Sequence, residues 1–488
     1  MKRIEAERKA GNVTQTKRPR ESALRTLTGL LPLALILVSF AFVQGALGQE
    51  APSDTLALDW DSAWQMALEK NESLDLARSE AEMSHYRVKE AYASAMPTIE
   101  LNGTLNHYFE IPSQPVTMPG ELNAANPGQP FTVAFQFSQE NTLGGTIQAT
   151  QPIWLAGKVG LALKVAKDYE RITRLGVQVS REDLRVSMLQ SFYGAMIADE
   201  YQATARDALA QAKRYQKQVQ EMFDQGAVSE YDLIRASVAV SNLKPQVSQA
   251  ESARDLAYKG LKMLIGLELD APIRIEGVLD AGLAPPELPY ETASKVAVEN
   301  RIELRQLQLQ KNLYEYQYKI EKRNWLWPNL MVGVRYESSA QSPDLDIPGY
   351  NFIDGLSGQV ILQIPLFDGF ASRNRAQQAK VNMKMVDLQL RRAKRGIEVE
   401  VFQAMREFQR SSEELIAAEE NVRQAEKGYN IAQTRYSGGI GTQLEVLDAQ
   451  LQLNQSRASL LQAKYNKLVT KAQYDRAVGN GFTLDTEE

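Results

Sequence analysis

A hydrophobic repeat of seven residues runs through a long stretch of the C-terminal half of this sequence. Large side chains stand at every seventh position and small ones follow three positions later; the large set is Val401, Phe408, Leu415, Val422, Tyr429 and Tyr436, and the small set is Ala404, Ser411, Ala418, Ala425 and Ala432. This pattern is typical of long helices that pack side by side, with a large side chain over a small one. The repeat therefore predicts a coiled-coil wall, which an ordinary globular core would not need.

The lengths of the helical stretches predict how this wall is built. Residues from about Lys158 to Phe223 contain no proline, and one helix of that length would be on the order of 100 Å long. The neighbouring stretches 59 to 95 and 229 to 264 are each close to half as long. We therefore expect one long helix to lie beside two short helices stacked end to end.

The sequence contains two copies of one unit. The segment "FDQGAVSEYD" has a counterpart in "YSGGIGTQLEVLD", and Gly439 follows Gly226 by 213 residues. The same spacing separates Pro152 from Pro365. An extra segment in the first copy is rich in proline, glycine and asparagine, which predicts a loop. We place the first copy at 56–285, its extra loop at 111–130, the second copy at 286–480 and a C-terminal tail at 481–488.

Four segments alternate apolar and polar residues, as half-buried strands do. They are 98–109, 143–154, 329–337 and 355–367. Each is near the ~9 to 11 residues of a tilted membrane-spanning strand, and such strands span a membrane only in a closed barrel. Four strands do not close a barrel by themselves, so a membrane location requires several chains. A small soluble sheet half-buried against a helix would give the same alternation.

Residues 1–48 have the features of a secretory signal peptide. Eight lysines and arginines precede an apolar run from Leu30 to Val43, and "ALG" at 46–48 offers a small-x-small cleavage pattern. The run is shorter than the ~20 residues of a spanning helix, although a retained N-terminal anchor is the alternative. The segment carries a net charge of +5, so its removal would change the formal charge of the chain from −5 to −10. A chain this acidic is not expected to bind nucleic acid.

Residue types that enzymes and metal sites need are scarce in this chain. The sequence has no cysteine, and its two histidines are His85 and His107. We find no nucleophile–base pair, no metal-ligand cluster and no phosphate-binding loop. We therefore expect no enzyme activity, no cofactor and no bound metal.

Taken together, these features resemble the TolC family of trimeric outer-membrane channels. The resemblance rests on the duplication, on the two glycine turns, on "QPIW" and "IPLFDG" where a strand passes into a long helix, and on "AYASAMPTIEL" before the first strand. It implies a mainly α fold with a membrane β-barrel part, in which a homotrimer shares a twelve-strand barrel in the outer membrane and an α-barrel that extends into the periplasm. It also implies a passive exit channel of a tripartite efflux or type I secretion system, served by a periplasmic membrane-fusion adaptor and an inner-membrane pump.

The resemblance assigns roles to the two glycine turns, which would lie at the periplasmic tip of the tube. The adaptor would dock on Gly226, Ala227, Val228 and Ser229 and on Gly439, Ile440, Gly441 and Thr442. The pore constriction would be formed by Glu445, Asp448, Asp232 and Tyr436. For the three acidic residues, the alternative is a solvated carboxylate that the helix dipole stabilises near a helix start. Gly441 stands where related channels often have a basic side chain that helps to latch the closed tip, which puts such a latch in doubt.

The alternative function is that of an extracytoplasmic coiled-coil interaction protein, such as a pump adaptor or a scaffold. It would explain the seven-residue repeat but not the four strands at duplicated positions. Drug export, metal-ion export and protein secretion share the implied architecture, and the sequence does not choose among these three substrates.

Overall fold

The computed structural model describes residues 56–136, 138–277, 279, 288–344 and 351–479. The chain divides into two units, Met1–Leu56 and Ala57–Glu488, and the description that follows concerns the second unit. The signal peptide expected at 1–48 and the tail expected at 481–488 lie outside the described residues. In the described ranges, no helix is both long enough and apolar enough to cross a membrane.

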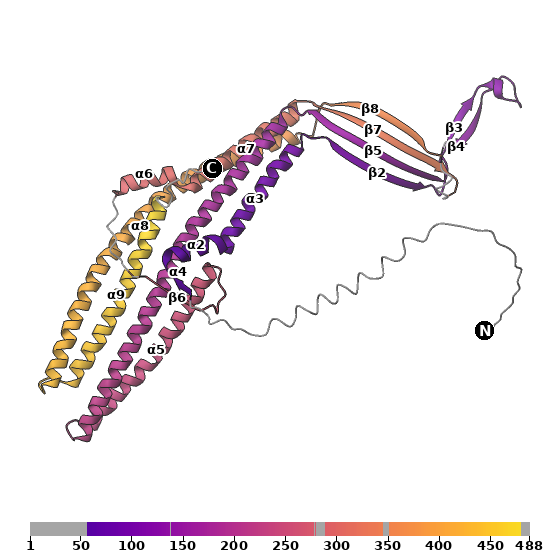
Figure 1. The fold of residues 1–488 in the computed structure, drawn as a ribbon. Coiled ribbons are helices and arrows are strands. Elements are labelled where there is room, and N and C mark those ends of the chain that lie inside the picture. Colours follow the sequence, from indigo (N-terminus) through magenta and orange to yellow (C-terminus); the bar gives the residue numbers. More distant parts are fainter. Residues whose placement is uncertain (1–55, 137, 278, 280–287, 345–350, 480–488) are drawn as a thin grey trace, which may run out of the picture. The chain divides into compact units, whose positions relative to one another are not determined.

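Helices dominate the described chain, and two of them are exceptionally long (Figure 1). The long ones, α4 (Lys158–Asp224) and α8 (Ala371–Ser437), have 67 residues each, which corresponds to about 100 Å. The prediction of a continuous helix from Lys158 is confirmed. The shorter helices are α2 (Trp60–Lys70), α3 (Glu72–Ala93), α5 (Glu230–Leu264), α6 (Tyr290–Asn300), α7 (Ile302–Leu326) and α9 (Gln443–Val478).

The long helices alternate with stacked pairs of shorter ones. Helices α3 and α5 both pack along α4, while α7 and α9 pack along α8 and also contact α4 (Figure 1). The order across the wall is therefore α3/α5, α4, α7/α9, α8. This is the predicted arrangement of one long helix beside two short ones, and it occurs twice.

The duplication extends to the ends of the helices. Helix α8 begins and ends 213 residues after α4, and α9 begins 213 residues after α5. Both long helices follow two consecutive residues with positive φ, namely Ala156 and Gly157 before α4, and Gly369 and Phe370 before α8. The internal duplication is thus confirmed at the level of backbone conformation.

Each stack of short helices has a polar side chain at its junction. The prediction of one helix over 59–95 was wrong, because Asn71 separates α2 from α3. Its Nδ2 donates to the carbonyl oxygen of Leu264 at the end of α5 (3.0 Å), and its Oδ1 accepts from the N–H of Leu74 (3.1 Å). In the second copy Arg301 has this position, where it contacts the carbonyl oxygen of Ala477 and pairs with Glu400. These contacts satisfy helix-end groups that would otherwise lack partners.

Buried clusters surround both junctions. In the first copy Phe192, Met188 and Leu261 form one core with a small sheet of β1 (Leu56–Leu58) and β6 (Ile273–Ile275) beside it. In the second copy Val401 and Phe408, two large residues of the seven-residue repeat, are fully buried. Toward the tip the repeat is less buried, since Val422, Tyr429 and Tyr436 are only partly covered within one chain.

Four antiparallel strands form a sheet in the order β2, β5, β7, β8. A strand is present at each predicted place; the strands are β2 (Thr98–His107), β5 (Asn141–Trp154), β7 (Asn329–Ser342) and β8 (Ile353–Gln363). The edge strands expose apolar residues, with Leu101 of β2 and Leu356 of β8 each 75 % exposed. Among the described residues no helix packs extensively against this sheet. The alternative of a soluble sheet half-buried on a helix therefore lacks its covering helix.

The extra segment of the first copy is more than a loop. It contains β3 (Ser113–Met118) and a short 3-10 helix, η1 (Gly120–Leu122), and β3 pairs with β4 (Phe131–Gln136) in a separate antiparallel hairpin. The expectation of a loop at 111–130 was therefore wrong for residues 113–118. β-branched residues such as Val116, Thr132 and Val133 favour the strand conformation between the proline-rich ends.

Candidate functional site

The candidate site is formed by the two turns that join α4 to α5 and α8 to α9. At the first turn Gly226 has φ +74°, and the N–H of Ala227 donates to the carbonyl oxygen of Met222 (2.8 Å). This is the usual way to end a helix at a left-handed glycine. Ser229 then caps α5, since its Oγ accepts from the N–H of Asp232 (3.3 Å).

The second turn repeats this geometry. Gly439 has φ +73°, and the N–H groups of Ile440 and Gly441 both donate to the carbonyl oxygen of Arg435 (3.0 Å each). Thr442 caps α9 by accepting from the N–H of Glu445 (3.3 Å). The two glycine turns are therefore equivalent tight connections between antiparallel helices.

Glycine is required at the second turn for two different reasons. At Gly439 the space around a Cβ is open, but the positive φ disfavours any other residue. At Gly441 a Cβ would lie 2.9 Å from the backbone nitrogen of Tyr436, which is too close. A basic side chain of the kind implied for related channels would not fit at Gly441 without a shift of the turn.

The carboxylate of Asp232 is bound within its own turn. Its Oδ2 accepts from the N–H of Ser229 (3.1 Å) and from the Ser229 hydroxyl (2.7 Å), which completes a capping box. The alternative of a helix-start carboxylate thus has a direct structural basis at Asp232. A role of this residue in a pore stays a prediction.

Glu445 and Asp448 lie on the exposed side of the first turns of α9. Both side chains are exposed, whereas Val446 and Gln450 on the other side of the helix are buried. Glu445 Oε2 lies 3.9 Å from Arg435 Nη2, and within the described chain Asp448 has no ion pair or hydrogen bond through its side chain. These two carboxylates are therefore one helical turn apart and face away from the wall of their own chain.

Tyr436 belongs to a contact between the helix pair α4–α5 and the helix pair α8–α9. The sequence did not predict this contact. The ring centroid of Tyr436 lies 5.9 Å from that of Tyr215 on α4, and its hydroxyl lies 4.0 Å from Met222 Sδ. Burial raises the pKa of the Tyr215 phenol, and the neighbouring Tyr436 raises it further, so the phenol stays neutral. Gln443, 7 % exposed, donates to the carbonyl oxygen of Asp232 (3.1 Å). The internal duplication did not point to Tyr215 and Gln443, because neither residue is repeated in the other copy. The equivalent of Tyr215 is Gly428, and the equivalent of Gln443 is Glu230.

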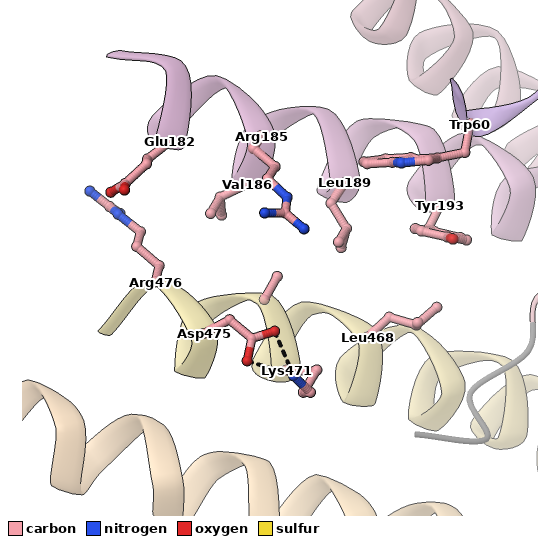
Figure 2. A pocket seen from close by; sticks show the side chains of 11 residues that line it. Trp60, Glu182, Arg185, Val186, Leu189, Tyr193, Leu468, Lys471, Asp475 and Arg476 are labelled. Carbon is pink, nitrogen blue, oxygen red and sulfur yellow. Dashed lines mark hydrogen bonds and ion pairs between the residues drawn. The ribbon is translucent and has the colours of Figure 1, made fainter. Parts of the chain in front are cut away.

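A pocket of about 280 Å³ lies farther along the wall, between α4 and α9 (Figure 2). Trp60 and Tyr193 form one end, with their rings stacked at 5.9 Å, and Glu182 points toward Arg476 at the other end. Burial raises the pKa of Glu182, and the negative charge of Glu303 adds to this effect. No group of three or more histidine, aspartate or glutamate side chains in the described ranges is placed to hold a metal ion.

Comparison with known proteins gives one family. The family model described as outer membrane efflux protein matches residues 63–267 and 293–480. The chain is 21 % identical to the outer membrane protein TolC of Escherichia coli over 347 residues, which cover 70 % of each chain. It is 24 % identical to the cobalt-zinc-cadmium resistance protein CzcC of Cupriavidus metallidurans over 358 residues, which cover 70 % of this chain and 78 % of CzcC.

The fold agrees with a solved channel structure. The crystal structure of CusC superposes with a TM-score of 0.68 over 89 % of this chain and 95 % of that chain, at 16 % sequence identity. The duplicated helical wall, the four-stranded sheet and the family match favour an outer-membrane efflux or secretion channel over the alternative of a coiled-coil adaptor or scaffold. The chain belongs to the outer membrane efflux protein family and is a protein of the outer membrane that extends into the periplasm.

Proposed function

We propose that three copies of this chain close into one tube, which gives passive exit to substrates delivered by an inner-membrane pump through a periplasmic adaptor. The observation that carries the proposal is that the helical wall and the sheet have matching free edges. The wall ends in α3/α5 on one side and α8 on the other, and the sheet ends in β2 and β8. Helix α3 leads into β2, and β8 leads into α8.

A single symmetric contact would therefore complete both layers. If α3/α5 and β2 of one chain meet α8 and β8 of the next, every free edge finds a partner and the ring closes. Unpaired strand edges are costly in a membrane, which favours closure of the sheet. Three chains supply the twelve strands of a barrel wide enough for a lumen.

Exposed apolar residues follow both edges of the helical wall. On α8 they recur along one side of the helix at Val381, Leu388, Phe402, Ile416 and Ile431, and on the opposite edge they include Leu76, Tyr231, Leu256 and Met263. Burial of such side chains in a contact between chains stabilises the assembly by roughly 25 cal/mol per Å² of apolar surface. The two stripes are the surfaces through which we expect neighbouring chains to pack.

The mass of the protein in mild detergent tests this proposal. We expect a trimer for the natural chain and a loss of trimer for Ile416→Glu, which places a charge in the stripe on α8. Asn421→Glu adds the same charge at an exposed position of α8 outside the stripe and should leave the trimer intact. A natural chain that is a stable monomer, or equal effects of the two substitutions, would contradict the closed tube.

The glycine turns form the adaptor-docking surface of this tube in our proposal. Ile440, 75 % exposed, and Val228 give each turn an apolar residue at its apex, where a partner can bury it. With three-fold symmetry, Glu445 and Asp448 of each chain would gather around the axis as rings of carboxylates. Asp232 and Tyr436 would support this constriction from the neighbouring elements of the same chain.

A further inference from the structure

A groove between α7 and α8 contains an unusual concentration of positive charge. Its volume is about 520 Å³, and the C-terminal end of α6 closes one side. Five cationic side chains line it: Arg301 and four others, namely Arg305 of α7 and Lys384, Arg391 and Lys394 of α8. In the part of the chain that the structure describes, none of these four makes a hydrogen bond or an ion pair through its side chain.

The two acidic residues of the groove offset its five cations only in part. Asp387 lies among them, but its Oδ1 is 2.7 Å from Nζ of Lys311. Glu299 is the other acidic residue of the lining. Lys384, Arg391 and Lys394 share one side of α8, and like charges at such spacing repel one another.

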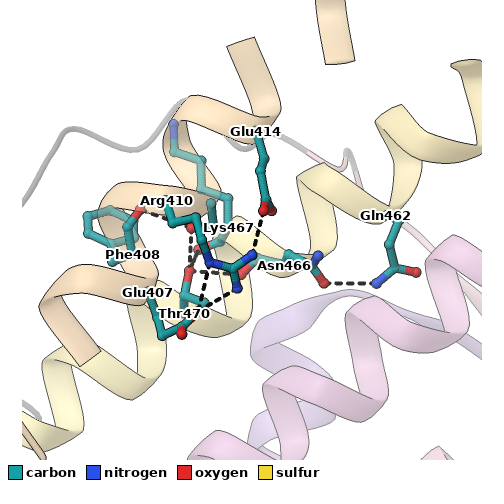
Figure 3. A network of polar contacts seen from close by, with 9 residues as sticks. Glu407, Phe408, Arg410, Glu414, Gln462, Asn466, Lys467 and Thr470 are labelled. Carbon is teal, nitrogen blue, oxygen red and sulfur yellow. Dashed lines mark hydrogen bonds and ion pairs between the residues drawn. The ribbon is translucent and has the colours of Figure 1, made fainter. Parts of the chain in front are cut away.

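Some cations on α8 and beside the groove are paired. Arg410 of α8 lies between Glu407 and Glu414 of the same helix, as Figure 3 shows. Arg301, which also borders the groove, is held by Glu303 and Glu400. The groove thus gathers four unpaired cations next to cations that have acidic partners.

The duplication provides an internal control for this cluster. The equivalent positions of the first copy are Asp75, Arg171, Gln178 and Arg181, with a net charge of +1 in place of +4. Asp75 pairs with Arg78, and Arg171 pairs with Asp168. Since the first copy forms the same wall without the four cations, the fold does not require them.

We propose that this groove binds an acidic, amphipathic polypeptide segment of a periplasmic partner protein. The floor includes Val298, Leu304 and Leu390, so the groove offers apolar contacts below a cationic rim. A segment with leucine-like and acidic side chains on one face matches both features, whereas a purely anionic polymer would leave the floor unused. Lys384 to Lys394 spans about 15 Å along α8, which suits an extended or helical segment.

The position of the groove excludes lipid headgroups as its occupant. Lys384 is about 20 Å along α8 from the end of that helix that faces the sheet. The inference rests on the proposed tube. Helix α6 would obstruct the conduit if it lay inside the tube, so the groove beside α6 lies on the outer face. One occupant for each chain is expected.

Fluorescence anisotropy with the full chain in detergent tests the proposal. The probe is a labelled helical peptide with glutamates and leucines on one face; one variant replaces glutamate by glutamine, and another replaces leucine by serine. We expect the first peptide to bind with strong salt dependence and both variants to bind at least about tenfold more weakly. Equal binding of the glutamine peptide would overturn the role of charge. Equal binding of the serine peptide, with displacement by tripolyphosphate, would indicate a site for polyanions without need of the apolar floor.

Paired substitutions in the protein locate the binding surface. Arg391→Gln with Lys394→Gln should weaken peptide binding by about tenfold, whereas Arg392→Gln with Arg395→Gln removes the same charge from α8 outside the lining and should change it far less. Equal losses in both variants would overturn the groove assignment. The mass of the same samples shows whether the trimer is present. Absence of the trimer and loss of peptide binding are therefore measured separately.

Discussion

Arg435 at the end of α8 and Glu445 at the start of α9 face each other across the second glycine turn, with Nη2 3.9 Å from Oε2. Both side chains are about half exposed, so the pair adds little to stability, roughly 0 to 1 kcal/mol. Its main effect is on charge, because the proposed ring of Glu445 carboxylates has a ring of Arg435 side chains beside it. Asp448 has no such partner within the described chain.

Removal of the carboxylates should reduce the cation preference of the pore. Glu445→Gln with Asp448→Asn keeps the shapes of the side chains and removes two negative charges from each chain, which weakens the attraction of cations to a constriction. Planar-bilayer recordings of the trimer would measure this. Arg435→Gln is the matched control with the opposite sign and should increase cation preference. If neither variant alters selectivity, the carboxylates face away from the pore.

A side chain at Gly439 should loosen the tip without unfolding the wall. Gly439→Ala forces alanine into φ +73°, at an expected cost of about 1 kcal/mol, whereas Gly438→Ala retains an ordinary φ of −80°. Hydrogen exchange of the backbone amides of the turn should become about fivefold faster in the first variant, with little change in the second. Adaptor binding should weaken in the same order. Identical exchange in both variants would show that φ does not limit the turn.

A methyl group at Gly266 should strain the junction of the first copy. Its Cβ would lie 2.5 Å from Cβ and 2.8 Å from the carbonyl oxygen of Lys70, and φ is +65°. We expect Gly266→Ala to cost about 2 kcal/mol or more, seen as a lower thermal midpoint by circular dichroism. Gly260→Ala, in the interior of α5 with open space around its Cβ, should instead gain about 0.5–1 kcal/mol. A midpoint unchanged by Gly266→Ala would refute the strained contact.

Glu182 should make stability depend on pH. Burial and the charge of Glu303 raise its pKa above the ordinary value of 4.5. Its contribution to stability is therefore present below pH 4.5 and is lost as pH rises through the folded-state pKa. Glu182→Gln should raise the thermal midpoint relative to the natural chain, by a difference that grows above pH 4.5.

Glu303→Gln should have the opposite effect near neutral pH. Burial by itself would raise the pKa of Glu303, but the hydrogen bonds from Arg301 outweigh burial and the pKa is lowered. The stability that it contributes is present above the ordinary value and is lost as pH falls through the lowered pKa. Thermal midpoints of both variants across pH 3 to 8 would show curves of opposite sign; parallel curves would contradict these assignments.

The sequence by itself determined the elements whose causes are local. The seven-residue repeat through Phe408 and the absence of proline after Lys158 specify long helices, since each residue adds a backbone hydrogen bond to the turn before it. Gly226 and Gly439 mark reversals because a positive φ is a property of one residue. Alternation predicted the four strands but not all of their bounds. Strands β5 and β8 begin two residues early, β7 ends five residues late, and β2 and β8 end before the expected residues.

Only the tertiary structure decided what depends on residues far apart in the chain. Asn71 caps α3 through a local contact with Leu74, but its contact with the carbonyl oxygen of Leu264, 193 residues away, exists only in the folded chain. Tyr215, Tyr436 and Gln443 meet only because four helix ends converge at the tip. The cations of the α7–α8 groove likewise come from two helices whose packing brings Arg305 beside Lys384 and Arg391. Such contacts leave no periodic trace in the sequence, since their energies arise from packing between elements and not from local conformation.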